Sequence, residues 1–171
     1  TQALSKAVMG DPQQEGVRMG ALVNKGQKEE VLAKLDLLKS EAHSVYTHPL
    51  NLVGEQAIAD AFLGPQLLRH DDPLNAKHCH NIEAFGPVAT LMPYDSMEEA
   101  IALTKKGKGS LCCSLVSHDA AEARAFVTGA ATMHGRILIL DRECANESTG
   151  HGSPLPLLTH GGPGRAGGGE E

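Results

Sequence analysis

The residues best suited to chemistry lie near the middle of the chain, in the segment Asn81-Ile82-Glu83-Ala84-Phe85-Gly86-Pro87-Val88. Glu83 supplies a carboxylate, Phe85 supplies an aromatic ring, and a Gly-Pro break follows at once. A carboxylate can accept hydrogen bonds from the two vicinal hydroxyls of a ribose, and a ring can pack beside a flat nicotinamide. Spacing alone favours a simpler interpretation, a solvated glutamate beside a core phenylalanine.

The elements around this segment determine where the two side chains can be held. The apolar run Val88-Ala89-Thr90-Leu91-Met92 follows directly and is typical of a buried strand. We therefore expect Glu83 and Phe85 on a rigid loop that enters a sheet, where fixed side chains can meet a ligand. Ligands in open α/β sheets bind beyond the carboxyl ends of strands, whereas this segment precedes its strand.

A second group of candidate residues is His78-Cys79-His80, with His70 upstream. Imidazole and thiolate groups are the usual ligands of zinc, and a zinc protein that uses His78 and His80 is one alternative. Zinc sites usually need a second spaced pair of ligands, and no such pair is evident. We therefore predict no metal site.

The four cysteines, Cys79, Cys112, Cys113 and Cys144, lack the spacing of a disulfide framework. Cys112 and Cys113 are adjacent in a predicted strand, so their side chains should face opposite ways, and both are expected to pack in the core. Cys144 follows a strand end without a flanking base, which favours a core or loop cysteine. Because the cysteines lack such spacing, we expect a reduced, cytoplasmic setting for the protein.

The second half of the chain alternates between strands and helices. One helix is predicted at residues 97–105, after the capping box Ser96-Met97-Glu98-Glu99. Another is predicted to follow Asp119, which can cap it, and to run to about Thr132. Strands are predicted at residues 88–93, 110–117 and 136–141. This alternation predicts an α/β fold with a mostly parallel sheet flanked by helices, and we expect residues 1–171 to form a single domain.

The first half is less regular. Residues 27–42 are predicted to form an amphipathic helix, whose apolar stripe is Val31, Leu32, Leu35 and Leu38. Residues 1–9 resemble the end of a helix, and residues 44–47 and 62–68 are predicted to be extended. The glycine-rich segment 161–169 lacks a phosphate-binding pattern, so a tight irregular loop against the sheet or a frayed terminus is expected there.

Composition excludes several classes of protein. The chain has 171 residues, of which 41% are hydrophobic, so it should fold rather than stay disordered. Its net charge is −6 (15 Lys and Arg against 21 Asp and Glu) and it has no basic stripe, which argues against nucleic acid as a partner. No apolar run is long enough to predict a membrane span. The chain begins with Thr1 rather than Met, which allows for a missing leading segment.

Taken together, the motifs resemble those of the aldehyde dehydrogenase superfamily. Glu83-Ala84-Phe85-Gly86-Pro87-Val88 resembles that family's Glu-x-Phe-Gly-Pro-Val motif. Val8-Met9-Gly10-Asp11-Pro12, followed by Met19-Gly20-Ala21-Leu22-Val23, is similar to the stretch after the family's catalytic cysteine. The segment 135–140 and the turn Gly161-Gly162 resemble its closing strand and glycine turn. The resemblance covers essentially all of the chain.

The resemblance implies roles for particular residues. Glu83 would hold the nicotinamide ribose of NADP or NAD, and Phe85 would lie beside the nicotinamide. The loop from Ser148 to Leu155 would line the aldehyde tunnel, which makes substrate contacts of the following residues: Ser148, Thr149, His151 and Ser153. Segments 147–156 and 160–171 resemble the branch of the family that oxidises CoA-linked semialdehydes in bacterial phenylacetate and benzoate degradation.

The family's nucleophilic cysteine, glutamate base and Rossmann cofactor domain have no counterpart in these 171 residues. We therefore expect no catalytic residue in this chain and no activity from the chain alone. It would act with the rest of the same enzyme on a CoA-linked aldehyde, as a homo-oligomer when full length. The alternative from the residues is a non-enzymatic α/β module that pairs with another chain.

Overall fold

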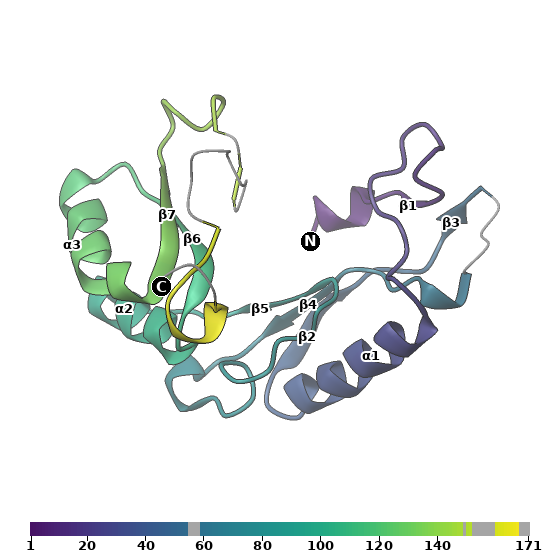
Figure 1. Cartoon of the computed structure of the whole chain (residues 1–171), viewed down its shortest axis with the longest axis horizontal. Coiled ribbons are helices and arrows are strands. Elements are labelled where there is room, and N and C mark those ends of the chain that lie inside the picture. The colour runs from purple at the N-terminus through teal and green to yellow at the C-terminus, as the bar shows by residue number, and fades with distance from the viewer. Residues whose placement is uncertain (55–58, 149, 152–159, 168–171) are drawn as a thin grey trace. The chain divides into compact units, whose positions relative to one another are not determined.

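The computed structural model describes residues 1–54, 59–148, 150–151 and 160–167 (Figure 1). The chain divides into two compact units, Thr1–Pro93 and Tyr94–Glu171, and each is described by itself. The single domain expected from the sequence therefore stays a prediction. Within the described residues, no helix has both the length and the apolar character needed to cross a membrane.

The first unit is built on a three-stranded sheet with one long helix. Helix α1 (Lys25–Lys39) begins where the Asn24 side chain accepts a hydrogen bond from the Gln27 backbone amide. The strands are β2 (His43–Thr47), β4 (Gln66–Arg69) and β5 (Val88–Leu91), in the order β2-β4-β5. Strands β2 and β4 are antiparallel, and β4 and β5 are parallel.

The core of this unit lies between α1 and the sheet. Leu35 and Leu38 of α1 pack against Leu68 of β4, which is fully buried. The helix predicted at residues 27–42 is confirmed, although it begins two residues earlier and ends at Lys39. Leu32, predicted for the apolar stripe, is 37% exposed because it lies beside the buried line rather than on it.

The start of the chain differs from the prediction. Residues 1–9 were expected to end a helix, but only a 3₁₀ turn forms at Leu4–Lys6. The next residues form strand β1 (Met9–Gly10), which runs parallel to β3 (Leu52–Val53). Met9 is fully buried in this pairing, so tertiary packing overrides a short helical pattern. Further 3₁₀ turns lie at Ala59–Ala61, Pro73–Asn75, Ala131–Met133 and Gly164–Ala166.

The second unit contains two helices on one side of a parallel strand pair (Figure 1). Its elements are α2 (Met97–Lys106), β6 (Ser110–Val116), α3 (Ala120–Ala130) and β7 (His134–Leu140). Both predicted helix caps are confirmed: the Ser96 hydroxyl accepts from the Glu99 amide, and the Asp119 carboxylate accepts from the amides of Ala121 and Glu122.

The predicted class of sheet is confirmed, with parallel strands flanked by helices, but the sequence pattern did not name the strand that pairs with residues 88–91. The sequence pattern places the strand at residues 88–93 in one alternation with the two later strands. The structure pairs β5 with β4 in the first unit, in the register Gln66 to Val88 through Arg69 to Leu91. The parallel register depends on contacts between distant segments, which periodicity does not encode.

The glycine-rich segment is a tight loop against the sheet, one of the two predicted alternatives, over its described residues 161–167. The Arg165 amide donates a 2.9 Å hydrogen bond to the Lys108 carbonyl. A Cβ atom on Gly135 would lie 2.0 Å from the Gly161 carbonyl oxygen, and one on Gly162 would lie 2.5 Å from that of Ser110. Glycine is therefore required at these positions because backbone approaches backbone.

Gly135→Ala should lower the free energy of unfolding of the second unit by about 1–3 kcal/mol, because the added methyl group must displace the Gly161 backbone. The matched control is Gly107→Ala, where the nearest atom, the Thr104 carbonyl oxygen, leaves an ordinary 3.7 Å contact. The control should change stability by no more than about 0.5 kcal/mol. Urea unfolding of both variants measures the difference, and equal midpoints would contradict the close packing.

Candidate functional site

The loop before β5 turns Glu83 and Phe85 outward while it buries the residue between them. Ala84 is buried and packs with Val31 and Leu63, whereas the Phe85 side chain is 65% exposed. Phe85 also has φ = 54°, in the left-handed region that bulky residues rarely adopt. Such a conformation costs on the order of 1–3 kcal/mol and persists only where surrounding contacts enforce it. Phe85 is therefore no core residue but an exposed ring on a strained turn.

One face of helix α1 holds this turn in place. The Gln27 side-chain amide donates a 3.0 Å hydrogen bond to the Phe85 carbonyl oxygen. Val31 lies one helical turn after Gln27. A Cβ atom at Gly86 would lie 2.8 Å from the Val31 side chain, so the loop backbone rests directly on the helix. The Lys34 ammonium lies 5.4 Å from the centre of the Phe85 ring, within the range of a cation–π contact. Residues 27, 31 and 34 follow helical spacing, so a single stripe fixes the loop.

Glu83 lies on the same loop and is exposed. Its carboxylate has no hydrogen bond or ion pair with any residue in the described part of the chain. An exposed carboxylate with all its acceptor positions open can receive hydroxyl donors from a ligand. The structure thus places both predicted cofactor-binding side chains on one rigid, outward-facing loop.

The predicted substrate loop belongs to the second unit. The Ser148 hydroxyl accepts a 3.0 Å hydrogen bond from the Gly150 amide, which makes a local turn. His151 reaches strand β6, where its Nδ1 lies 2.6 Å from the Ser114 hydroxyl and its Nε2 lies 3.3 Å from the Cys112 sulfur. Thr149 and Ser153 lie outside the described residues. The prediction that Cys112 packs in the core is wrong, because the residue is only half-buried and its sulfur lies within hydrogen-bonding distance of an imidazole nitrogen.

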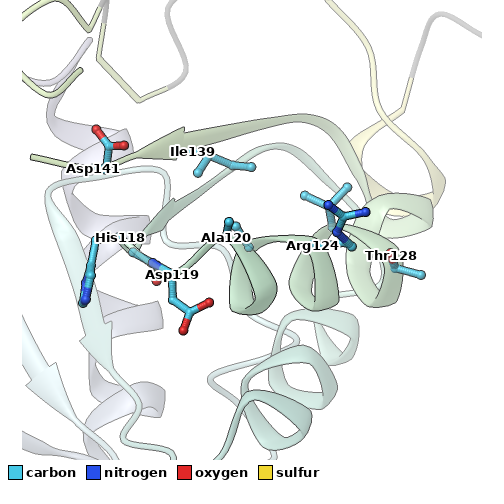
Figure 2. A pocket seen from close by; sticks show the side chains of 10 residues that line it. His118, Asp119, Ala120, Arg124, Thr128, Ile139 and Asp141 are labelled. Carbon is cyan, nitrogen blue, oxygen red and sulfur yellow. Dashed lines mark hydrogen bonds between the residues drawn. The ribbon is translucent and has the colours of Figure 1, made fainter. Parts of the chain in front are cut away.

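A cavity of about 460 Å³ lies at the carboxyl end of β6, beside the start of α3 (Figure 2). Figure 2 shows His118, Asp119 and Asp141 at one end of it, with Arg124 and Thr128 along the helix. The sequence identified Asp119 only as a helix cap and none of these residues as part of a site, although the strand-end rule points to this edge.

The two acids of this cavity are already engaged by the backbone. Asp119 accepts from the Glu122 and Ala121 amides, and these bonds lower its pKa. Asp141 accepts from the amides of Cys144 and Glu143, which likewise lowers its pKa. Both carboxylates therefore organise local turns, and nothing in their geometry indicates acid–base chemistry.

The candidate metal ligands are arranged differently from the pattern suggested by the sequence. His80 is buried and its Nε2 lies 2.6 Å from the Pro73 carbonyl oxygen. Among the described residues, the cluster with metal-like spacing is Glu41, His70 and Cys79, whose ligand atoms lie within 4.8 Å of one another.

Hydrogen bonding makes this cluster a poor metal site. Glu41 accepts bonds of 2.9, 2.8 and 2.7 Å from the backbone amides of Lys77, His78 and Cys79. Burial raises the pKa of the Cys79 thiol, as does its hydrogen bond to Glu41, to about 12. A thiol that keeps its proton is a weak zinc ligand. The cluster instead ties the loop at residues 77–79 to the end of α1.

Burial acts to raise the pKa of Glu41, but the hydrogen bonds from the loop outweigh it and lower the pKa from 4.5 to about 2. Because the folded-state pKa lies below the ordinary value, Glu41 stabilises the fold above pH 4.5, and this contribution is lost as the pH falls toward 2. Glu41→Gln should lower the free energy of unfolding by about 1–3 kcal/mol at neutral pH.

The measurement is chemical unfolding at several pH values. The difference between wild type and Glu41→Gln should shrink as the pH falls from 4.5 toward 2, since over that interval the wild-type carboxylate binds a proton in the unfolded chain before it does in the folded one. Glu30→Gln, a change on the exposed surface of α1, is the matched control and should show little difference at any pH. A Glu41 effect that is independent of pH would contradict this account.

Comparison with known proteins agrees with the motifs and the fold. Residues 1–151 match the aldehyde dehydrogenase family. Protein MaoC of Klebsiella aerogenes is 49% identical over 156 residues, which cover 90% of this chain and 45% of that protein. The 3,4-dehydroadipyl-CoA semialdehyde dehydrogenase of Aromatoleum evansii is 40% identical over 162 residues, which cover 94% of this chain and 32% of that enzyme.

Solved structures show the same fold. Betaine aldehyde dehydrogenase from Staphylococcus aureus, crystallised with NAD⁺, superposes with a TM-score of 0.78 at 20% identity, over 98% of this chain and 31% of that one. Aldehyde dehydrogenase C from Pseudomonas syringae, crystallised with NAD⁺ and octanal, superposes with a TM-score of 0.74 at 24% identity. The superposition covers 98% of this chain and 32% of that one. The chain spans less than half the length of the two curated relatives described above. It belongs to the aldehyde dehydrogenase family.

Proposed function

We propose that this chain is part of a nicotinamide-dependent dehydrogenase that oxidises a CoA-linked semialdehyde to the acid in aromatic-acid degradation. The observation that carries the proposal is the loop of Glu83 and Phe85, which α1 holds outward in a strained conformation. The match to the family and the identity to a CoA-semialdehyde dehydrogenase support the same reaction class. These matches do not favour the alternative of a non-enzymatic interaction module.

The residues present fit a nicotinamide dinucleotide. The exposed Glu83 carboxylate has open acceptor positions for the two hydroxyls of a ribose. Phe85 offers the face or edge of a ring, and its fixed backbone would set the position of the neighbouring nicotinamide. The bound nicotinamide would supply the hydride acceptor for aldehyde oxidation. NAD and NADP share this ribose, so the proposed contacts serve either cofactor.

The loop that carries Ser148, Thr149, His151 and Ser153 is proposed to contact the aldehyde substrate. The CoA-linked substrate class is proposed from the name of the relative from Aromatoleum evansii, which shares 40% of the aligned residues. The catalytic nucleophile and base are proposed to come from the rest of the same enzyme, which would act in the cytoplasm as a homo-oligomer.

Glu83→Gln in the full-length enzyme tests the proposed ribose contact. The neutral amide makes weaker hydrogen bonds to hydroxyl groups than a carboxylate does, so kcat/KM for the cofactor should fall about 10- to 100-fold. Stopped-flow measurement of hydride transfer and cofactor titration separate a slower step from weaker binding. The matched control is Glu29→Gln on the exposed surface of α1. Unchanged kinetics in Glu83→Gln would contradict the ribose contact and would show that Glu83 is an ordinary solvated glutamate.

The purified 171-residue chain should not oxidise any aldehyde with NAD or NADP, because the proposal assigns the nucleophile and base to other parts of the enzyme. Absorbance at the wavelength of the reduced nicotinamide measures turnover directly. The full-length enzyme under the same conditions is the control. Steady turnover by the 171-residue chain would contradict the proposed division of roles.

A further inference from the structure

Strand β6 and the segment at residue 151 bring together a thiol, an imidazole and a hydroxyl. Cys112 and Ser114 are two residues apart on β6, so their side chains lie on the same face of the strand. His151 bridges them: its Nε2 lies 3.3 Å from the Cys112 sulfur and its Nδ1 lies 2.6 Å from the Ser114 oxygen. All three residues belong to the second unit.

A thiol, an imidazole and a hydroxyl that are hydrogen-bonded in this order are typical of an activated nucleophile. A base within hydrogen-bonding distance can take the proton of a nucleophile, provided that a third group orients the base. When the Ser114 oxygen accepts a hydrogen bond from the Nδ1–H of His151, the lone pair of Nε2 is left facing the Cys112 thiol. Transfer of the thiol proton then produces a thiolate beside an imidazolium, an ion pair that stabilises the reactive form of sulfur.

The other three cysteines lack such an arrangement. Burial raises the pKa of Cys79 to about 12, together with its hydrogen bond to Glu41. Burial also raises the pKa of Cys113. The Cys144 sulfur accepts from the Asp141 amide, and its thiol donates to the Ile139 carbonyl. In the part of the chain that the structure describes, an imidazole nitrogen is a hydrogen-bond partner of the thiol only at Cys112.

We propose that Cys112, His151 and Ser114 form a reactive-thiol site that hydroperoxides oxidise. The Cys112 sulfur attacks one peroxide oxygen, so a sulfur–oxygen bond forms as the oxygen–oxygen bond breaks. The departing oxygen takes the proton that His151 received from the thiol. Sulfur is oxidised by two electrons to a sulfenic acid, and the hydroperoxide is reduced to an alcohol or to water. His151 is also one of the proposed substrate contacts, but this oxidation uses neither the nicotinamide nor the aldehyde of the proposed dehydrogenase reaction.

Peptide-resolved mass spectrometry of the full-length protein tests the proposal. At pH 7, iodoacetamide should alkylate Cys112 about tenfold faster than Cys79, Cys113 or Cys144, because, among the described residues, only its sulfur lies within hydrogen-bonding distance of an imidazole nitrogen that can take its proton. After treatment with hydrogen peroxide, a sulfenic-acid trap such as dimedone should label Cys112 ahead of the same three residues. A Cys112 rate within twofold of that of the other three would overturn the proposal.

His151→Asn should remove most of the rate advantage of Cys112, while His118→Asn, at an exposed histidine outside the cluster, should leave it unchanged. Ser114→Ala keeps the imidazole but removes the group that orients it, so it should cause a partial loss. Circular dichroism and thermal unfolding establish that each variant is folded. Retention of the full Cys112 rate in both folded variants, His151→Asn and Ser114→Ala, would show that the imidazole does not activate the thiol and would overturn the proposal.

Discussion

The candidate site depends on one hydrogen bond between distant parts of the first unit, from the Gln27 amide to the Phe85 carbonyl. The other end of the same side chain accepts a 2.8 Å bond from the Val23 amide. Both halves of the amide are therefore in use, so a glutamate at this position would lose the donor that Phe85 requires. The bond compensates for a backbone conformation that an isolated chain would avoid, and it leaves the ring facing outward.

Local structure was largely predictable from the sequence because its signals are local. The Ser96 and Asp119 caps act within one helical turn, and the stripe of Val31, Leu35 and Leu38 repeats with the helical period. The partner of β5 was not predictable in this way. Strand β4 follows a Gly-Pro interruption at Gly64-Pro65, and only tertiary contacts place it beside residues 88–91.

The same distinction applies to the sites. The types of Glu83 and Phe85, with the family resemblance, were enough to nominate them, but the left-handed backbone of Phe85 has no signature at a non-glycine position. The cluster of Cys112 and His151 joins residues 39 positions apart, so no spacing rule could reveal it. Glu41 was missed for a similar reason, since its role is to bind backbone amides that every residue possesses.

The distance along the chain between Gln27 and Phe85 has a consequence for how the first unit folds. Their hydrogen bond closes a loop of 58 residues, whereas α1 is stabilised within its own sequence. Closing such a loop lowers the entropy of the chain, and early in folding too few contacts have formed to offset that cost. We therefore expect the helix and its packing on β4 to form first, and the turn at Phe85 to take its shape only on that completed surface. The aromatic ring would then acquire its working orientation among the last steps of folding.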